Sequence, residues 1–149
     1  MQGLPHHYAV TATTTTAEYV DITSAGLERI ESAPPAEFGG PGDRWSPETL
    51  LVAAVADCFI LTYKAIARAS KLPWVSLSCE VDGVLDRVDR TTQFTEFSLR
   101  VVLDVPRGTD EQKARRLLEK AEHACLITNS LNASTHLDME VRISDDDGA

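Results

Sequence analysis

The sequence is poor in cysteine, and its three cysteines form no CxxC pair. They are Cys58, Cys79 and Cys125, an odd number that cannot all be paired within one chain. A disulfide-stapled fold uses an even set of cysteines, and a structural zinc site uses closely spaced Cys and His ligands. The chain has neither pattern and no HExxH motif, so we expect no metal and no bound cofactor.

Basic residues and long apolar runs are also scarce. Lys and Arg number 14 against 23 Asp and Glu, which gives a net charge of −9. Nucleic acids and anionic lipid surfaces attract clustered positive charge, so we expect neither as a partner. The longest apolar run, Leu50 to Ala56, has seven residues and is too short to span a membrane. The opening MQGLPHHYAV lacks the pattern of an export signal, so the predicted location is cytoplasmic.

The 149 residues are enough for a single domain with a hydrophobic core, and we expect one domain over 1–149. Three β-branched or alternating segments, 7–15, 18–23 and 26–32, predict strands. Residues 33–45 hold three prolines and three glycines and predict a loop. The acidic tail, 144–149, is expected to be disordered.

A long helix is predicted to follow that loop. Ser46 is a natural N-cap and Pro47 suits the first helical position. The helical pattern continues to about Lys71, and Pro73 stops it. After the first turn its charged residues share one narrow stripe, and most of the remaining surface is apolar or small. A helix of this kind must be covered on most sides, so we expect a second copy of the chain against it, in a homodimer.

The rest of the chain predicts two strands, a helix and a last strand. Segments 76–88 and 95–105 alternate like half-buried strands, with a polar turn over 86–93. A capping box from Thr109 to Gln112 predicts a helix that ends near His123, and 124–132 suggests a short helix. Segment 135–143 predicts a strand. The order is βββ–α–ββ–α–β, an α+β fold.

The cysteines carry different expectations. Cys79 alternates with Leu77 and Val81 and predicts core packing. Cys58 lies on an apolar helical face, where a cysteine is commonly structural. Cys125 lies just after a helix, in a turn of small residues where a thiol can be reached. Brought together by the fold, one of these two could attack as a thiolate and the other resolve the product.

Three ordered motifs resemble those of one family. SPETLLVAAVADCF resembles the signature that begins the central helix of the OsmC/Ohr hydroperoxide-reductase superfamily, and KAEHACLITNSL resembles its second cysteine segment. PAEFGGPGDRWSPE is similar to the family's loop before the central helix. The predicted element order also matches, so the resemblance covers nearly the whole chain and implies an OsmC-like fold.

The resemblance implies a function and an assembly. Cys58 corresponds to the peroxidatic cysteine, Cys125 to the resolving cysteine and Glu48 to the family glutamate. The implied activity is the reduction of organic hydroperoxides, with re-reduction by a dithiol of the lipoyl type. The implied assembly is an intertwined homodimer with a long buried central helix. Glu48 and Cys58 are about 15 Å apart along one helix, so a shared site would need Glu48 of one subunit near Cys58 of the other, or an arginine between them.

The family's activating arginine has no counterpart at the expected places. The two positions used by relatives hold Glu18 and Phe38 here. Arg44 in the loop, or Arg29 on the preceding segment, is then the candidate for the cation beside Cys58. His123, two residues before Cys125, could tune that thiol or simply be a solvated residue at a helix end.

Two other functions fit the same scaffold. In one, an apolar pocket around Phe38, Trp45 and Phe59 binds a small ligand without catalysis, and the cysteines only line it. In the enzyme, the same three side chains would contact the organic part of the peroxide. In the second, the chain is a structural dimer with inert thiols.

Overall fold

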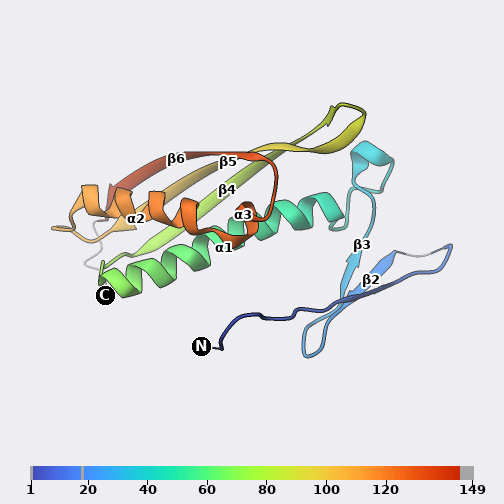
Figure 1. Cartoon of the computed structure of the whole chain (residues 1–149), viewed down its shortest axis with the longest axis horizontal. Coiled ribbons are helices and arrows are strands. Elements are labelled where there is room, and N and C mark those ends of the chain that lie inside the picture. The colour runs from blue at the N-terminus through green and yellow to red at the C-terminus, as the bar shows by residue number, and fades with distance from the viewer. Residues whose placement is uncertain (1, 18, 145–149) are drawn as a thin grey trace. The chain divides into compact units, whose positions relative to one another are not determined.

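The computed structural model describes residues 2–17 and 19–144, and the chain divides into two compact units, Met1–Leu51 and Val52–Ala149. Its elements run in the order predicted from the sequence, with one short addition, the 3-10 turn η1 (Ala36–Phe38) (Figure 1). The short helix α3 (Leu126–Asn129) lies inside the segment predicted for it. The α+β class and the helix predicted over 124–132 are therefore confirmed.

The first unit is built on a small antiparallel sheet. Its strands β1 (Thr11–Thr13), β2 (Val20–Thr23) and β3 (Ile30–Ser32) lie in that order. All three strands fall where the sequence predicts them but are shorter. Residues of β1 are exposed throughout, so a longer ladder there would bury little apolar surface.

The chain reverses after β3 in a tight loop. Gly40 allows it, because a Cβ there would lie 1.7 Å from the Pro34 carbonyl oxygen. The end of the loop returns to the sheet, where the Ala33 backbone N–H donates to the Trp45 carbonyl at 2.9 Å. The loop predicted over 33–45 is thus an ordered connection that delivers the chain to the next helix.

Helix α1 (Pro47–Ser70) begins and ends as predicted. The Ser46 hydroxyl accepts from the Thr49 backbone N–H at 3.1 Å, and the Thr49 hydroxyl accepts from the Ser46 N–H at 2.8 Å. These two bonds satisfy donors that a helix start leaves open. At the other end Lys71 takes a left-handed φ of 56°, which lets the Leu72 N–H bond back to the Ala67 carbonyl.

One face of α1 is the core of the second unit. Val55, Phe59, Tyr63 and Ala67 recur every four residues and are all buried. By length and hydropathy alone α1 could also cross a membrane. Core helices of soluble proteins have the same composition, and this buried stripe is what such a helix requires.

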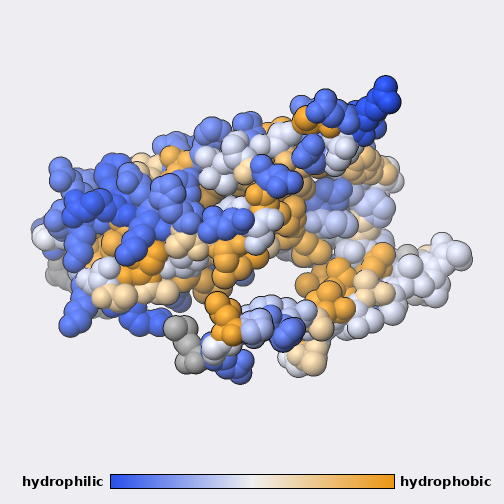
Figure 2. Space-filling view, viewed as in Figure 1, coloured by the Kyte–Doolittle hydropathy of each residue, from blue (hydrophilic) through white to orange (hydrophobic). Residues whose placement is uncertain are grey.

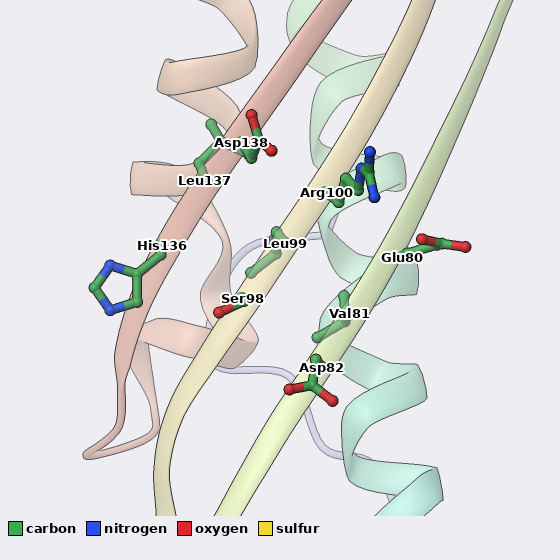
Figure 3. Close-up of a pocket in the computed structure, with 9 residues that line it drawn as sticks. All are labelled: Glu80, Val81, Asp82, Ser98, Leu99, Arg100, His136, Leu137 and Asp138. Atoms are coloured by element: carbon green, nitrogen blue, oxygen red, sulfur yellow. The ribbon is translucent and has the colours of Figure 1, made fainter.

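The second sheet has the order β4–β5–β6, with β4 (Ser76–Val88) antiparallel and β6 (Ser134–Ile143) parallel to the central β5 (Thr91–Val105). Alternate residues of β5 are buried: Phe97, Leu99, Val101, Leu103 and Val105. In β4, Gly83 lies directly under α1, since a Cβ there would be 2.9 Å from Val52 Cγ2. The helices therefore cover one face of the sheet, and Figure 3 looks onto the other face with the helices behind the strands.

Two details correct the sequence predictions. The polar turn expected over 86–93 is a two-residue turn at Asp89 and Arg90, both with positive φ, and the strands extend to either side of it.

The N-cap of α2 (Glu111–Ala124) is Asp110 and not Thr109, because the Asp110 carboxylate accepts from the Lys113 N–H at 3.1 Å. An ionised carboxylate is the better acceptor at a helix start, and the Thr109 hydroxyl has no partner among the described residues.

The acidic tail predicted over 144–149 is described only at its first residue. The Ser144 N–H donates to the Val105 carbonyl at 2.7 Å and so continues the β5–β6 ladder. The remaining five residues, like Glu18, lie outside the described part of the chain.

Candidate functional site

Cys58 and Cys125 come together in the second unit. Cys58 lies near the middle of α1, and Cys125 is the residue between α2 and α3, where it serves as the N-cap of α3. Each of the two side chains shifts the pKa of the other, which places them in the same neighbourhood of the folded chain. The roles of nucleophile and resolving thiol stay predictions.

The two thiols differ in access to solvent. Cys125 is only 1 % exposed, whereas Cys58 is partly exposed. An external oxidant can reach a partly exposed sulfur more readily than a buried one. The geometry thus favours Cys58 as the thiol that meets a substrate and Cys125 as its internal partner.

The surroundings of Cys58 favour its thiolate. Burial raises the pKa of Cys58, but the backbone N–H of Ile127 and the Cys125 side chain oppose that effect. The Thr62 hydroxyl and the Leu126 N–H add to this opposition, and the pKa of Cys58 falls below its ordinary value. Leu126 and Ile127 open α3, where backbone N–H groups have no partner inside the helix. Within the described part of the chain, the groups that lower this pKa are uncharged hydrogen-bond donors.

Cys125 responds in the opposite direction. Burial raises the pKa of Cys125, and the neighbouring Cys58 sulfur raises it further. Bonds with Thr128 only partly offset the rise. Of the two thiols, Cys125 therefore holds its proton more firmly than Cys58 does.

Cys79 is the third thiol of the same unit. Burial raises its pKa to about 11, and its interaction with Cys125 contributes to the rise. Cys79 alternates with the half-buried Leu77 and Val81 on β4, as predicted for a packing residue. Nothing in its surroundings stabilises a thiolate at neutral pH.

The remaining polar candidates lie in the first unit or at a helix end. Arg44 pairs with Glu31 at 3.2 Å and Asp43 at 3.3 Å and stacks over the Tyr19 ring. Arg29 pairs with Asp21 and Glu31. Both guanidinium groups are thus engaged with carboxylates of their own unit, and their role beside Cys58 stays a prediction.

Glu48 and His123 differ in burial. One carboxylate oxygen of Glu48 is buried and has no hydrogen-bond partner among the described residues. His123 is exposed in the last turn of α2, as expected of a histidine at a helix end. The role assigned to Glu48 also stays a prediction.

The three aromatic candidates have different surroundings. Phe38 and Trp45 are 60 % and 52 % exposed in the first unit, whereas Phe59 is completely buried in the core of the second. Phe59 therefore packs from α1 into the core of the second unit, and its contact with a ligand stays a prediction.

Sequence reasoning missed two groups that act on the Cys58 sulfur, which are the Thr62 hydroxyl and the backbone N–H groups of α3. Thr62 could have been found from its position four residues after Cys58, which places it on the same helical face.

A pocket on the second sheet lies apart from the two cysteines. It has a volume of about 750 Å³ and lies on the face of the β4–β5–β6 sheet that the helices leave open (Figure 3). Glu80, Arg100 and Asp138 stand side by side across it, as the strand register requires. Neither Cys58 nor Cys125 lines it, and among the described residues no group of His, Cys, Asp and Glu could hold a metal ion.

Comparison with known proteins gives the family. The pattern of the OsmC-like protein family matches residues 40–140, about two thirds of the chain. An uncharacterised protein of Bacillus subtilis, YmaD, is 29 % identical over 112 residues, which cover 73 % of this chain and 75 % of YmaD. The peroxiredoxin OsmC of Escherichia coli is 28 % identical over 97 residues, covering 65 % of this chain and 67 % of that protein.

Solved structures show the same fold at low identity. An OsmC-like protein of unknown function from Vibrio cholerae superposes with a TM-score of 0.82 at 18 % identity, over 91 % of this chain and 99 % of the other. An organic hydroperoxide resistance protein from Elizabethkingia anophelis superposes with a TM-score of 0.73 at 20 % identity, over 95 % of this chain and 100 % of the other. The shared fold, the element order and the matched pattern agree, and the chain belongs to the OsmC-like protein family.

Proposed function

We propose that this protein is a thiol peroxidase that reduces organic hydroperoxides, with Cys58 as the nucleophile and Cys125 as the resolving cysteine. The observation that supports it most is the contrast between two neighbouring thiols, one partly exposed with a lowered pKa and the other buried with a raised pKa. A peroxidase needs this asymmetry, because the thiolate is the nucleophile and the resolving thiol must be close by. Relatives named as a peroxiredoxin and as hydroperoxide resistance proteins support the same chemistry.

The first step oxidises Cys58. Its thiolate attacks the terminal oxygen of the hydroperoxide, a sulfur–oxygen bond forms, and the O–O bond breaks. The electron pair of that bond leaves with the alkoxide, which takes a proton and departs as the alcohol. Sulfur is oxidised to a sulfenic acid and the peroxide is reduced.

The second step uses the neighbouring thiol. Cys125 attacks the Cys58 sulfenic acid, a disulfide forms, and the hydroxyl leaves with the Cys125 proton as water. A dithiol, of the lipoyl type or similar, then exchanges with the disulfide and restores both thiols while it becomes oxidised itself. Glu48 and one arginine, Arg44 or Arg29, stay the candidates for binding the peroxide oxygens.

The test follows peroxide loss with reduced protein, cumene hydroperoxide and excess dithiol. We expect Cys58→Ser to lose the activity. Cys125→Ser should react once and then stall, and Cys79→Ser, the matched control, should turn over like the parent. Peroxide loss at the parent rate in Cys58→Ser would refute the proposal.

A homodimer through α1 is a further part of the proposal. Leu61 is 57 % exposed on this helix and Ala65 is exposed beside it. Figure 2 shows hydrophobic surface gathered along the course of α1, while α2 presents mostly hydrophilic side chains. A second copy would bury this surface. Light scattering should give twice the chain mass for the parent and a lower mass for Leu61→Glu; a parent of monomer mass contradicts the dimer.

A ligand-binding protein without catalysis is the second candidate. It is favoured by the exposed rings of Phe38 and Trp45, and by a pocket of about 510 Å³ in the first unit that Tyr19 and Val20 help to line. Such a protein would leave the hydroperoxide unchanged in the assay above. It would instead bind an apolar probe with unchanged affinity in the Cys58→Ser variant.

A further inference from the structure

Thr62 places a hydroxyl against the reacting sulfur. It follows Cys58 by four residues in α1, so the two side chains lie one above the other on the same helical face. The Thr62 Oγ1 and Cys58 Sγ atoms are 3.8 Å apart and hydrogen-bonded. The resemblance to the family assigns no role to this threonine.

The direction of this hydrogen bond is set by the charge on sulfur. A thiolate has no proton to give, so the Thr62 hydroxyl is the donor whenever Cys58 is ionised. A threonine inside a helix commonly donates to the carbonyl four residues earlier. Within the described residues, the hydrogen bond that the structure gives this hydroxyl goes to the Cys58 sulfur instead.

We propose that Thr62 is a catalytic residue, whose hydroxyl donates a hydrogen bond to the Cys58 thiolate and holds the sulfur in the orientation that attacks the peroxide. This role rests on the peroxidase function proposed above. It also supplies a fixed donor in a site where Arg44 and Arg29 are paired with carboxylates elsewhere.

Besides Cys125, three uncharged donors on two elements favour the Cys58 thiolate. Thr62 lies on the helix of Cys58 itself, whereas the N–H groups of Leu126 and Ile127 come from the start of α3. Threonine is branched at Cβ, which restricts its χ1 and limits the entropy lost when it is held as a donor. Donors on two elements fix the direction of the sulfur better than one can, and that leaves its remaining face for the peroxide.

Stabilising the thiolate costs some nucleophilicity but raises reactivity at neutral pH. The intrinsic nucleophilicity of a thiolate falls with its pKa with a slope of only about 0.4–0.5. The ionised fraction rises in full proportion as long as the pKa lies above the working pH. The net effect of the Thr62 hydrogen bond is therefore a faster reaction.

The experiment compares Thr62→Val, Thr62→Ser and the parent. Valine keeps the shape and removes the hydroxyl, and serine keeps the hydroxyl. Iodoacetamide modifies Cys58 over a range of pH, and mass spectrometry of the Cys58 peptide gives the rate at each pH. Tyr63→Phe is the matched control, since it removes a hydroxyl from the adjacent residue of α1 that has no hydrogen-bond partner among the described residues.

We expect the pH midpoint of Cys58 modification to move upward in Thr62→Val. Its rate at pH 7 should fall roughly two- to tenfold, as the loss of one hydrogen bond to a charged sulfur predicts. Thr62→Ser and Tyr63→Phe should follow the parent. If Thr62→Val keeps the parent midpoint and rate, the proposal fails. Thr62→Ala, with its higher helix propensity, replaces valine if circular dichroism shows that the valine variant does not fold.

Cumene hydroperoxide consumption separates this proposal from the proposed function. A parent that does not consume peroxide, but whose Cys58 midpoint still depends on Thr62, refutes the peroxidase and retains the donor role. If the parent consumes peroxide but the pH midpoint of Cys58 modification is the same in the parent and in Thr62→Val, the peroxidase proposal stands and the donor role of Thr62 is refuted.

Discussion

The Cys58 and Cys125 thiols shift each other's pKa in opposite directions, although one lies near the middle of α1 and the other directly before α3. The partly exposed sulfur is the one with the lowered pKa, and the buried sulfur is the one with the raised pKa. A disulfide between the two would join neighbouring side chains of one unit. Oxidation would therefore be followed by resolution within the same unit of the same chain.

The three cysteines should react in a fixed order as the pH rises. The pKa of Cys58 is lowered, that of Cys125 is raised, and that of Cys79 is raised to about 11. Only the thiolate is alkylated, so Cys58 should be modified at the lowest pH, and Cys79 and Cys125 only at higher pH. Peptide mapping after brief iodoacetamide treatment from pH 6 to pH 9 measures the order. Cys79 modified before Cys58 would contradict the thiol environments described above.

Removing the resolving thiol should trap the oxidised sulfur. Cys125→Ser treated with one equivalent of cumene hydroperoxide should hold a Cys58 sulfenic acid, which a 1,3-diketone reagent captures as a stable adduct. The parent should yield the Cys58–Cys125 disulfide instead, with little adduct. Cys79→Ser serves as control and should behave as the parent does. If the parent forms a Cys58–Cys79 disulfide instead, Cys79 is the resolving cysteine and the role proposed for Cys125 is wrong.

The start of α2 offers a direct comparison of two adjacent residues. Asp110→Ala removes the carboxylate that caps Lys113 N–H and should cost about 1 kcal/mol of unfolding free energy. Thr109→Ala removes a hydroxyl without a partner among the described residues and should cost less. Urea unfolding of both variants measures the difference. If Thr109→Ala loses more unfolding free energy than Asp110→Ala, Thr109 is the effective N-cap, as the sequence pattern predicts.

Gly83 should not tolerate a side chain. A Cβ at this position would lie 2.9 Å from Val52 Cγ2 and 3.0 Å from Phe97 Cε1, so α1 and β5 would both have to move. Overpacking of this kind costs about 1–3 kcal/mol, and Gly83→Ala should lower the thermal midpoint accordingly. Gly3→Ala, where nothing lies within 4 Å, is the control and should leave the midpoint unchanged.

Sequence patterns anticipated the parts of the fold that depend on local rules. The cap at Ser46, the stop before Pro73 and the alternation of 76–88 each follow from the chemistry of neighbouring residues, and α1 and β4 have the predicted ends to within a residue. The turn at Asp89 and Arg90 lies inside the predicted range 86–93, but its length was overestimated because neither residue is the glycine or asparagine typical of a two-residue turn.

The site was anticipated only in part. The cysteine motifs singled out Cys58 and Cys125, but the groups that stabilise the thiolate include backbone N–H groups of Leu126 and Ile127, which carry no sequence signal. The sequence pointed to the side-chain cations Arg44 and Arg29. Thr62 is the one donor beside the sulfur that sequence spacing could have identified, whereas the α3 donors depend on tertiary structure.

The parallel pairing of β5 with β6 has a consequence for the order in which the site is completed. Two parallel neighbours cannot be joined by a tight turn, so the connection must travel the length of the sheet, and here α2, Cys125 and α3 make up that connection. During synthesis on the ribosome both cysteines emerge before β6, yet the segment that holds Cys125 is anchored at its far end only when β6 joins the sheet. Cys58 and Cys125 would thus be brought together late, after the rest of the sheet has formed, and a nascent chain arrested at residue 133 should show Cys125 as readily alkylated as any unfolded thiol.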